Sequence, residues 1–185
     1  MGVEHRVVDG EVDGEPLGSA RFVRIYDETA PRVHQYLARR VGPSHAEDLT
    51  AEVFAQAWAS RHRYDPGRGD PTGWVFGIVM NVLRRHHRSA ERQLRAYGRV
   101  VVERSTADPA EAVALGLDAR NELRATVRAL RKLSKLERDM ILLRAWAGLS
   151  YQQIGEALGI EVGLVKSRLN RARARVAAHA EEVPP

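Results

Sequence analysis

The chain has 185 residues, of which 44% are hydrophobic and 29% are charged, a composition that is ordinary for a soluble globular protein of one domain or two small ones. It contains no cysteine, which excludes disulfides and thiolate metal sites. No apolar run approaches the roughly 20 residues of a membrane helix, and the acidic start lacks the apolar core of a signal peptide. We therefore expect a cytoplasmic protein without membrane insertion.

The net charge of +5 is unevenly distributed along the chain. Residues 1–18 hold one arginine against five acids, whereas 19–95 hold 13 basic against 8 acidic residues and 122–185 hold 12 against 7. The stretch 96–121 between these basic blocks is slightly acidic. Two cationic blocks on a linker are typical of a protein that touches a polyanion at two places, although Arg-rich sequences also carry solvated basic faces.

The first basic block begins with two predicted helices. Apolar residues follow three- and four-residue spacing over 22–41, where Pro31 is expected to kink or restart the helix. Gly42-Pro43 ends it. Ser44 with Glu47 predicts a capping box that opens the second helix. The core stripe of the second helix consists of Leu49, Val53 and Ala57.

The other side of this second helix is mixed in character. It combines polar groups with two large aromatic side chains: Glu47, Asp48, Glu52 and Gln56, with Phe54 and Trp58 beside them. Acids next to large apolar groups can form a protein-docking surface. The residues alone leave that reading and an ordinary amphipathic helix equally open.

A third helix follows a loop at 60–71 that is rich in glycine and proline. Asp70 is expected to cap it, with Pro71 at its first position, and it should reach about Arg95. Trp74 falls on its apolar stripe, so we expect it in the core. The opposite face carries a basic stripe, Asn81, Arg85, Arg88 and Arg92, flanked by Arg84. With Tyr64 in the loop as a stacking candidate, this face suits single-stranded or melted nucleic acid.

Residues 96–118 lose the periodicity and are expected to form a linker. Helical patterns then return at 119–133, 135–147, 150–158 and about 162–178, and no strand pattern competes. We predict an all-α protein with two small helical domains, 19–95 and 119–178, joined by a flexible linker. The acidic tail at 1–18 is expected to be disordered.

The most specific local pattern is a helix-turn-helix at 149–176. Ser150 and Gln153 form a capping box, and Gly159 stands where the helix must end in a left-handed turn. Gly155 is unusual inside a helix, and its missing side chain is expected to permit a close approach. The inward face of the next helix is Val165, Leu169, Ala172 and Val176, and its outward face carries Lys166, Ser167, Asn170, Arg171 and Arg173. These groups can bind phosphates or base edges in a major groove, which favours a duplex reader over a solvated basic face.

Two other functions would fit parts of the sequence. A stand-alone helix-turn-helix regulator explains the second domain but neither the surface around Asp48 nor the basic stripe. A metal-dependent nuclease or phosphotransfer enzyme is suggested only by His86-His87, which point about 100° apart on a helix and lack paired carboxylates. We therefore expect neither an enzyme nor a bound cofactor or metal.

Both halves together resemble the extracytoplasmic-function type sigma factors of bacterial RNA polymerase. The N-terminal motif runs over 46–58 (AEDLTAEVFAQAW) and continues at 72–81 (TGWVFGIVMN), while the C-terminal motif covers 149–173. The resemblance implies a protein that binds core polymerase and directs promoter-specific initiation, with no catalytic role of its own. It also implies contacts with the clamp coiled coil of the largest subunit, the flap of the second subunit, promoter DNA and an anti-sigma factor.

The resemblance also assigns roles to residues of this chain. Docking on the clamp would involve Asp48, Leu49, Glu52, Val53 and Gln56. The minus-ten element, including a flipped base, would be engaged by Tyr64, Asn81, Arg84, Arg85 and Arg88. The minus-thirty-five duplex would be read by Lys166, Ser167, Asn170, Arg171 and Arg173. The chain departs from the usual family pattern at Lys135, Gly155, Glu161 and Leu164.

Overall fold

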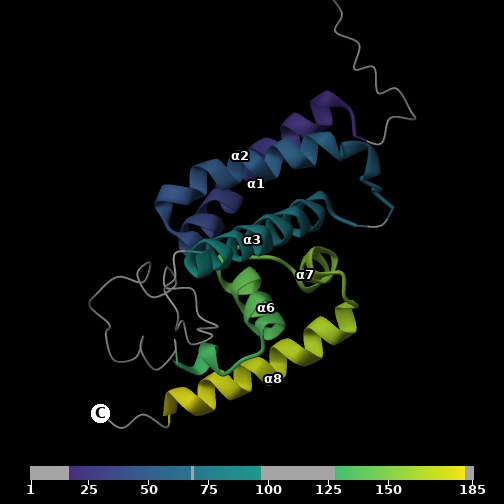
Figure 1. Ribbon diagram of the computed structural model, residues 1–185. Coiled ribbons are helices and arrows are strands. Elements are labelled where there is room, and N and C mark those ends of the chain that lie inside the picture. Colours follow the sequence, from purple (N-terminus) through teal and green to yellow (C-terminus); the bar gives the residue numbers. More distant parts are fainter. Residues whose placement is uncertain (1–16, 68, 97–127, 182–185) are drawn as a thin grey trace, which may run out of the picture.

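A computed structural model describes residues 17–67, 69–96 and 128–181, and within these ranges every regular element is a helix. Helices α1 and α2 lie together on one side of the central helix α3, and α6, α7 and α8 lie on its other side (Figure 1). The α-helices are α1 (Ser19–Val41), α2 (Pro43–Ala59), α3 (Pro71–Ala96), α6 (Lys135–Trp146), α7 (Tyr151–Leu158) and α8 (Val162–Glu181), and a 3-10 helix, η1, spans Arg61–Arg63. The all-α prediction is confirmed.

Some predicted segments fall outside the described residues. The tail at 1–18 and the linker at 96–118 lie almost entirely there, and the helix expected at 119–133 is described only from residue 128. The last three helices begin and end within a few residues of the predicted bounds.

The junction of α1 and α2 differs from expectation in two ways. Helix α1 runs unbroken through Pro31, which lies on its exposed side. Helix α2 starts at Pro43 and has no side-chain cap, so the predicted capping box of Ser44 and Glu47 is wrong. The physical reason is that proline is already suited to the first helical position, which places Ser44 inside the helix, where its hydroxyl contacts Nδ1 of His45 at 3.1 Å. Gly42 makes the sharp connection with a φ of 86°.

The start of α3 follows the prediction. The Asp70 carboxylate accepts a hydrogen bond from the backbone N–H of Thr72 at 2.8 Å, and Pro71 is the first helical residue. Burial acts to raise the pKa of Asp70, but hydrogen bonds from Thr72 and Gln153 outweigh it and hold that pKa below its usual value. The anionic form of Asp70 is therefore the one that the fold stabilises.

The helix-turn-helix also forms as predicted. The Ser150 hydroxyl accepts from the N–H of Gln153 at 3.1 Å, and the Gln153 side chain accepts from the N–H of Ser150 at 2.9 Å. Gly159 ends α7 in the left-handed conformation with a φ of 67°. A second capping box, which the sequence analysis did not identify, joins Ser134 and Glu137 at the start of α6.

Gly155 lies at the tightest approach within this motif. A Cβ atom at this position would stand 2.8 Å from the carbonyl oxygen of Ile160, whose own N–H donates to the carbonyl of Gly155 at 2.9 Å. The expected close approach is confirmed, and its partner is the backbone of the turn that leads into α8.

The two halves of the chain share one continuous apolar core. Buried residues of α1–α3 and of α6–α8 belong to a single cluster, and α3 packs along α7. Polar contacts reinforce this packing: Glu156 accepts from the N–H of Asp70 at 3.1 Å, and the Gln153 amide donates to the Asp70 carboxylate at 3.0 Å. Arg32 on α1 donates to the carbonyl of Ala147 at 2.7 Å. The sequence predicted two domains on a tether and gave no sign of this packing.

A buried ion pair also crosses between the halves. The Arg40 guanidinium on α1 lies 3.2 Å from the Asp139 carboxylate on α6, and both side chains are less than 10% exposed. Burial raises the pKa of the Asp139 carboxyl despite the opposing influence of Arg40. For Asp139, the cost of desolvation therefore outweighs the attraction between the two charges.

A first prediction concerns Gly155. We expect Gly155→Ala to lower the free energy of unfolding by about 1–3 kcal/mol, because the added methyl group forces the turn backbone apart. Gly163→Ala is the matched control: it also lies in a helix but would meet no atom within 4 Å, so better helix propensity should stabilise the protein by about 1 kcal/mol. Urea unfolding measures both. Equal stabilisation by the two alanines would contradict the strain at Gly155.

A second prediction concerns the buried ion pair. Asp139→Ala breaks a buried ion pair by removing one partner, which costs about 3–5 kcal/mol, and the two halves can reduce that cost by separating. We expect a larger radius of gyration in X-ray scattering for this variant. Arg40→Met combined with Asp139→Leu should keep the compact dimensions because no charge is left to hydrate. Expansion of the double variant to the same radius would show that the charges themselves hold the halves together.

Candidate nucleic-acid and polymerase interfaces

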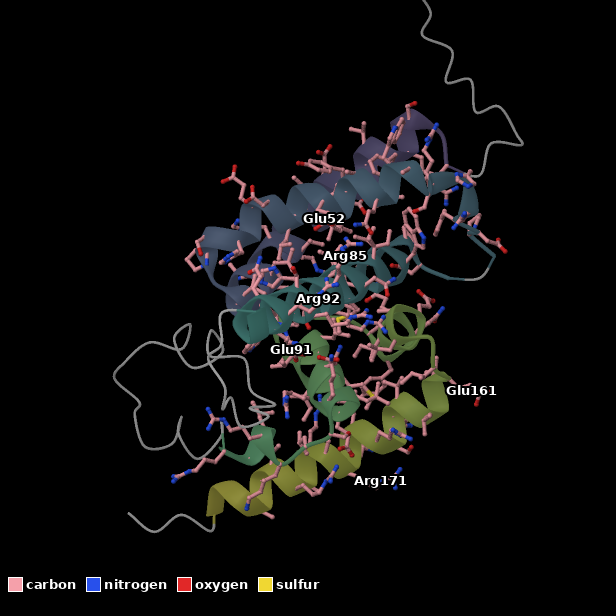
Figure 2. The ribbon with its side chains drawn as sticks, in the orientation of Figure 1. Glu52, Arg85, Glu91, Arg92, Glu161 and Arg171 are labelled. Carbon is pink, nitrogen blue, oxygen red and sulfur yellow. The ribbon has the colours of Figure 1, made fainter. Side chains whose placement is uncertain are left out.

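Helix α8 presents the outward face that its periodicity predicts. Val165, Leu169 and Ala172 are fully buried, and Val176 is half-buried toward the end of the stripe. The five side chains expected to read DNA are all exposed: Lys166, Ser167, Asn170, Arg171 and Arg173. Glu161 and Arg171 extend away from the body of the protein in Figure 2. The polar face is thus available to a partner while the two halves are packed together.

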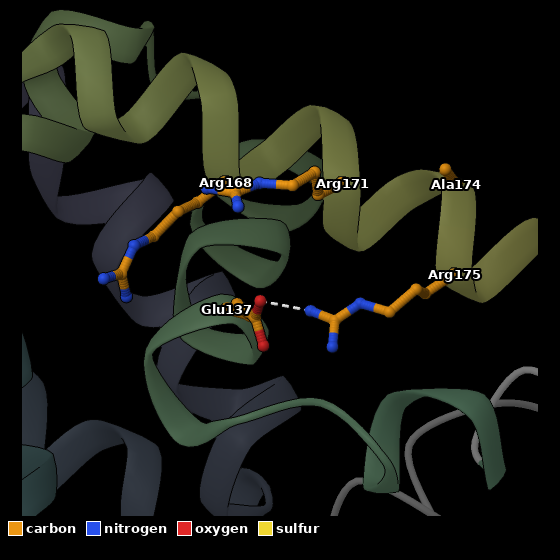
Figure 3. A pocket seen from close by; sticks show the side chains of 5 residues that line it. All are labelled: Glu137, Arg168, Arg171, Ala174 and Arg175. Atoms are coloured by element: carbon orange, nitrogen blue, oxygen red, sulfur yellow. Dashed lines mark hydrogen bonds and ion pairs between the residues drawn. The ribbon is translucent and has the colours of Figure 1, made fainter.

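A shallow groove beside this face adds two arginines that the sequence analysis did not single out as site residues. It is lined by Glu137, Arg168, Arg171, Ala174 and Arg175, and in Figure 3 the side chain of Arg175 points toward Glu137. Hydrogen bonds from Ser134 lower the pKa of Glu137, and the nearby charge of Arg175 acts in the same direction. Arg175 forms an ion pair with the Glu137 carboxylate, which fixes the direction of the Arg175 side chain in the groove. The helical spacing of 168, 171 and 175 was the available signal.

The basic stripe of α3 is likewise on the surface. Asn81, Arg84, Arg85 and Arg88 are all exposed, and a second shallow groove is lined by Asn81, Arg85, Arg88, Glu91 and Arg92. Arg84 donates to the Asn81 side chain at 2.7 Å and to the carbonyl of Met80 at 3.1 Å. These contacts hold the Arg84 side chain against the helix.

The stripe on α3 adjoins the acidic side of α2. Arg85 forms an ion pair with Glu52, and Gln56 donates to the same carboxylate at 3.2 Å. Figure 2 shows Glu52 and Arg85 at this junction of α2 and α3. Asp48 is exposed one turn earlier on α2. The polar residues expected to dock a partner therefore lie next to those expected to meet nucleic acid.

Two members of the expected docking set are not on this surface. Leu49 is 8% exposed and Val53 is fully buried, because both point from α2 into the shared core. In this conformation their contacts lie in the core, where they position the helix. Trp58, by contrast, is 40% exposed, and the guanidinium of Arg61 lies 4.0 Å from the centre of its ring system.

Tyr64 is buried, which differs from the exposed stacking ring that the loop suggested. Only 4% of the residue is exposed, its ring centre lies 5.3 Å from that of Trp74, and its hydroxyl donates to the carbonyl of Gly69 at 3.1 Å. Burial raises the pKa of Tyr64. In this conformation the ring closes the loop before α3 and offers no face to a base. Trp74 packs against the core as predicted.

Two features that would indicate other functions are absent from the described residues. No helix in these ranges is long and apolar enough to cross a membrane. Among the same residues, no group of three or more histidine, aspartate or glutamate side chains could hold a metal ion, and His86 faces the ring of His45 at 5.2 Å between centres.

Comparison with known proteins accounts for both halves. The family model "Sigma-70 region 2" matches residues 25–93, and "Sigma-70, region 4" matches residues 123–176. The chain is 31% identical over 153 residues to the ECF RNA polymerase sigma factor SigK of Mycobacterium sp. (strain KMS), covering 80% of this chain and 77% of that protein. It is 33% identical over 182 residues to the ECF RNA polymerase sigma factor SigE of Mycolicibacterium smegmatis, covering 88% and 67%.

A solved structure supports the same assignment. The sigma factor RpoE of Bartonella quintana, determined in complex with the anti-sigma factor NepR, superposes with a TM-score of 0.61 at 25% identity, covering 88% of this chain and 98% of that one. The region 2 match spans α2 and α3, and the region 4 match spans the helix-turn-helix. The chain belongs to the ECF RNA polymerase sigma factors.

Proposed function

We propose that this sigma factor binds promoter DNA at two places while it is bound to core polymerase. In this proposal the basic stripe on α3 engages the melted minus-ten element, and the outward face of α8 reads the minus-thirty-five element as duplex. The observation that carries it is the simultaneous exposure of two cationic surfaces, one on each half of the chain. Cationic grooves of this kind neutralise phosphates along a nucleic acid.

The contact with core polymerase is proposed for the outer side of α2. Asp48 is exposed there, and Glu52 is oriented by Arg85 and Gln56. Charged and polar side chains at this surface suit the rim of a protein interface. An exposed acid can steer a basic partner and contribute to its affinity.

An anti-sigma factor is proposed as a further partner. The support is the fold that the chain shares with RpoE, which was solved with NepR. The chain itself is proposed to hold no cofactor and to perform no chemistry: it positions the promoter, and the polymerase makes the RNA. A stand-alone regulator would leave the region 2 match and the surfaces of α2 and α3 without a role.

A third prediction tests initiation itself. Core polymerase with the full chain should transcribe a subset of a promoter-fragment library that core alone does not transcribe. The active fragments should share two sequence elements at a constant spacing, because two surfaces of one protein bind them. Initiation no better than core alone on every fragment would overturn the proposed function.

A fourth prediction separates polymerase binding from DNA binding. Asp48→Arg should weaken assembly with core polymerase by about tenfold or more, since it reverses the charge of a docking residue. Affinity of the full chain for duplex DNA should not fall. Asp27→Arg on α1 makes the same charge change at another exposed acid and should leave assembly intact. Analytical ultracentrifugation measures assembly, and equal losses in both variants would argue against the α2 surface.

A further inference from the structure

The first turn of α8 carries a chemistry that the proposed function does not use. Among the described residues, five large hydrophobic side chains are exposed, and two of them are Val162, at 44%, and Leu164, at 37%. Single exposed hydrophobic residues are ordinary on protein surfaces. Here two exposed hydrophobic side chains lie within three residues, at the start of the helix that faces duplex DNA in the proposed function. Such a pair suits a ligand that has apolar groups.

Helical spacing places these two residues on opposite sides of the exposed face of α8, with a narrow strip of the helix surface between them. Along the centre lie the small or short side chains Gly163, Ser167, Asn170 and Ala174. Leu164 begins one flank, which continues with Arg168, Arg171 and Arg175, and Val162 begins the other, which continues with Lys166 and Arg173. A Cβ on Gly163 would meet no atom within 4 Å, so the centre of the first turn is open. The helix can therefore approach a groove closely at its apolar end.

The charges along α8 differ between its two ends. The cations begin at Lys166, whereas the residue that precedes the helix is the exposed acid Glu161. Within the described residues the Glu161 side chain has no ion pair, and it extends into solvent in Figure 2. A carboxylate is repelled by phosphates but can accept a hydrogen bond from a base amino group. The first turn therefore suits the base edges in the groove, and the later turns suit the backbone.

We infer that Val162 and Leu164 read the 5-methyl groups of thymines in the major groove of the minus-thirty-five duplex. The methyl group of thymine is the apolar feature that the four bases offer there, and aliphatic side chains recognise it by contact. The specificity of this protein then depends on thymines under the first turn of α8 and not on cations alone. This inference rests on the proposed role of α8.

The test removes single methyl groups from the DNA. Duplexes bound by the full chain are first enriched from a random 20-base-pair library, which identifies the bound element. Each thymine of that element is then replaced by deoxyuridine, which lacks only the methyl group. We expect one or two replacements to weaken binding by about fourfold each, the effect of burying one methyl group, and the others to have no effect.

Protein variants connect the methyl groups to residues. For Leu164→Ala, the replacement of one sensitive thymine by deoxyuridine should no longer weaken binding. The ratio of the two dissociation constants, with uracil and with thymine at that position, then falls from about fourfold to one. Val23→Ala removes a hydrophobic side chain that is 56% exposed on α1 and should keep every ratio unchanged. Lys166→Ala should weaken all duplexes alike and lower the salt slope by about one, while the uracil ratios persist. Circular dichroism confirms that each variant is folded.

The outcomes distinguish this inference from the proposed function. If the library yields an element whose binding tolerates uracil at every position, the methyl contact is overturned and duplex reading by α8 stands. A fourfold ratio that persists in both Leu164→Ala and Val162→Ala would also overturn it. If the full chain enriches no duplex and its complex with core recognises no minus-thirty-five element, both the inference and the proposed role of α8 fail.

Discussion

The close approach of α7 to α3 is the contact on which the arrangement of both halves depends. The closest point lies at Gly73 of α3, where a Cβ atom would collide with the Glu156 side chain, while a Cβ at Gly77 would make ordinary contact with the backbone of Ala157 at 3.6 Å. In the polar part of this contact, one side chain serves two helices. One carboxylate, that of Asp70, caps α3 and also accepts from Gln153, whose side chain belongs to the capping box of α7. Two helix starts are thereby fixed to each other.

Several acids take part in the contacts between the two halves. The groups that tie the halves together include the acids Asp70, Glu156 and Asp139, each of which is buried or half-buried. The basic stripe of α3 and the cations of α8 remain on the surface. Each of the two exposed grooves nevertheless keeps one glutamate beside three arginines: Glu137 in the groove of α8 and Glu91 in the groove of α3. Because arginines outnumber glutamates in both grooves, each face can attract a polyanion.

The features that the sequence predicted correctly are local. The box of Ser150 and Gln153, the cap at Asp70 and the left-handed Gly159 each depend on side chains and backbone within three residues, so spacing is enough to find them. Ser44 was predicted wrongly because Pro43 competes for the same helix start. The burial of Tyr64 and the docking of α7 on α3 depend on partners elsewhere in the fold. The contacts between Asp70 and α7 join residues more than 80 positions apart. The spacing of apolar residues predicts helices and their buried faces, but it does not predict which helices pack together.

Helix α7 connects this packing to the placement of the reading helix. It has only eight residues, and its first two turns hold Gln153 and Glu156, which bind Asp70. From the same short helix, the carbonyl of Gly155 accepts from Ile160 in the turn, and a Cβ there would also touch Val162 at 3.5 Å. One side of α7 thus contacts α3, and another sets the position of the first turn of α8. The contact of α7 with α3 and the contact of Gly155 with the turn therefore position Val162 through the same short helix. The constraint that joins the two halves is therefore also the one that aims the apolar end of α8.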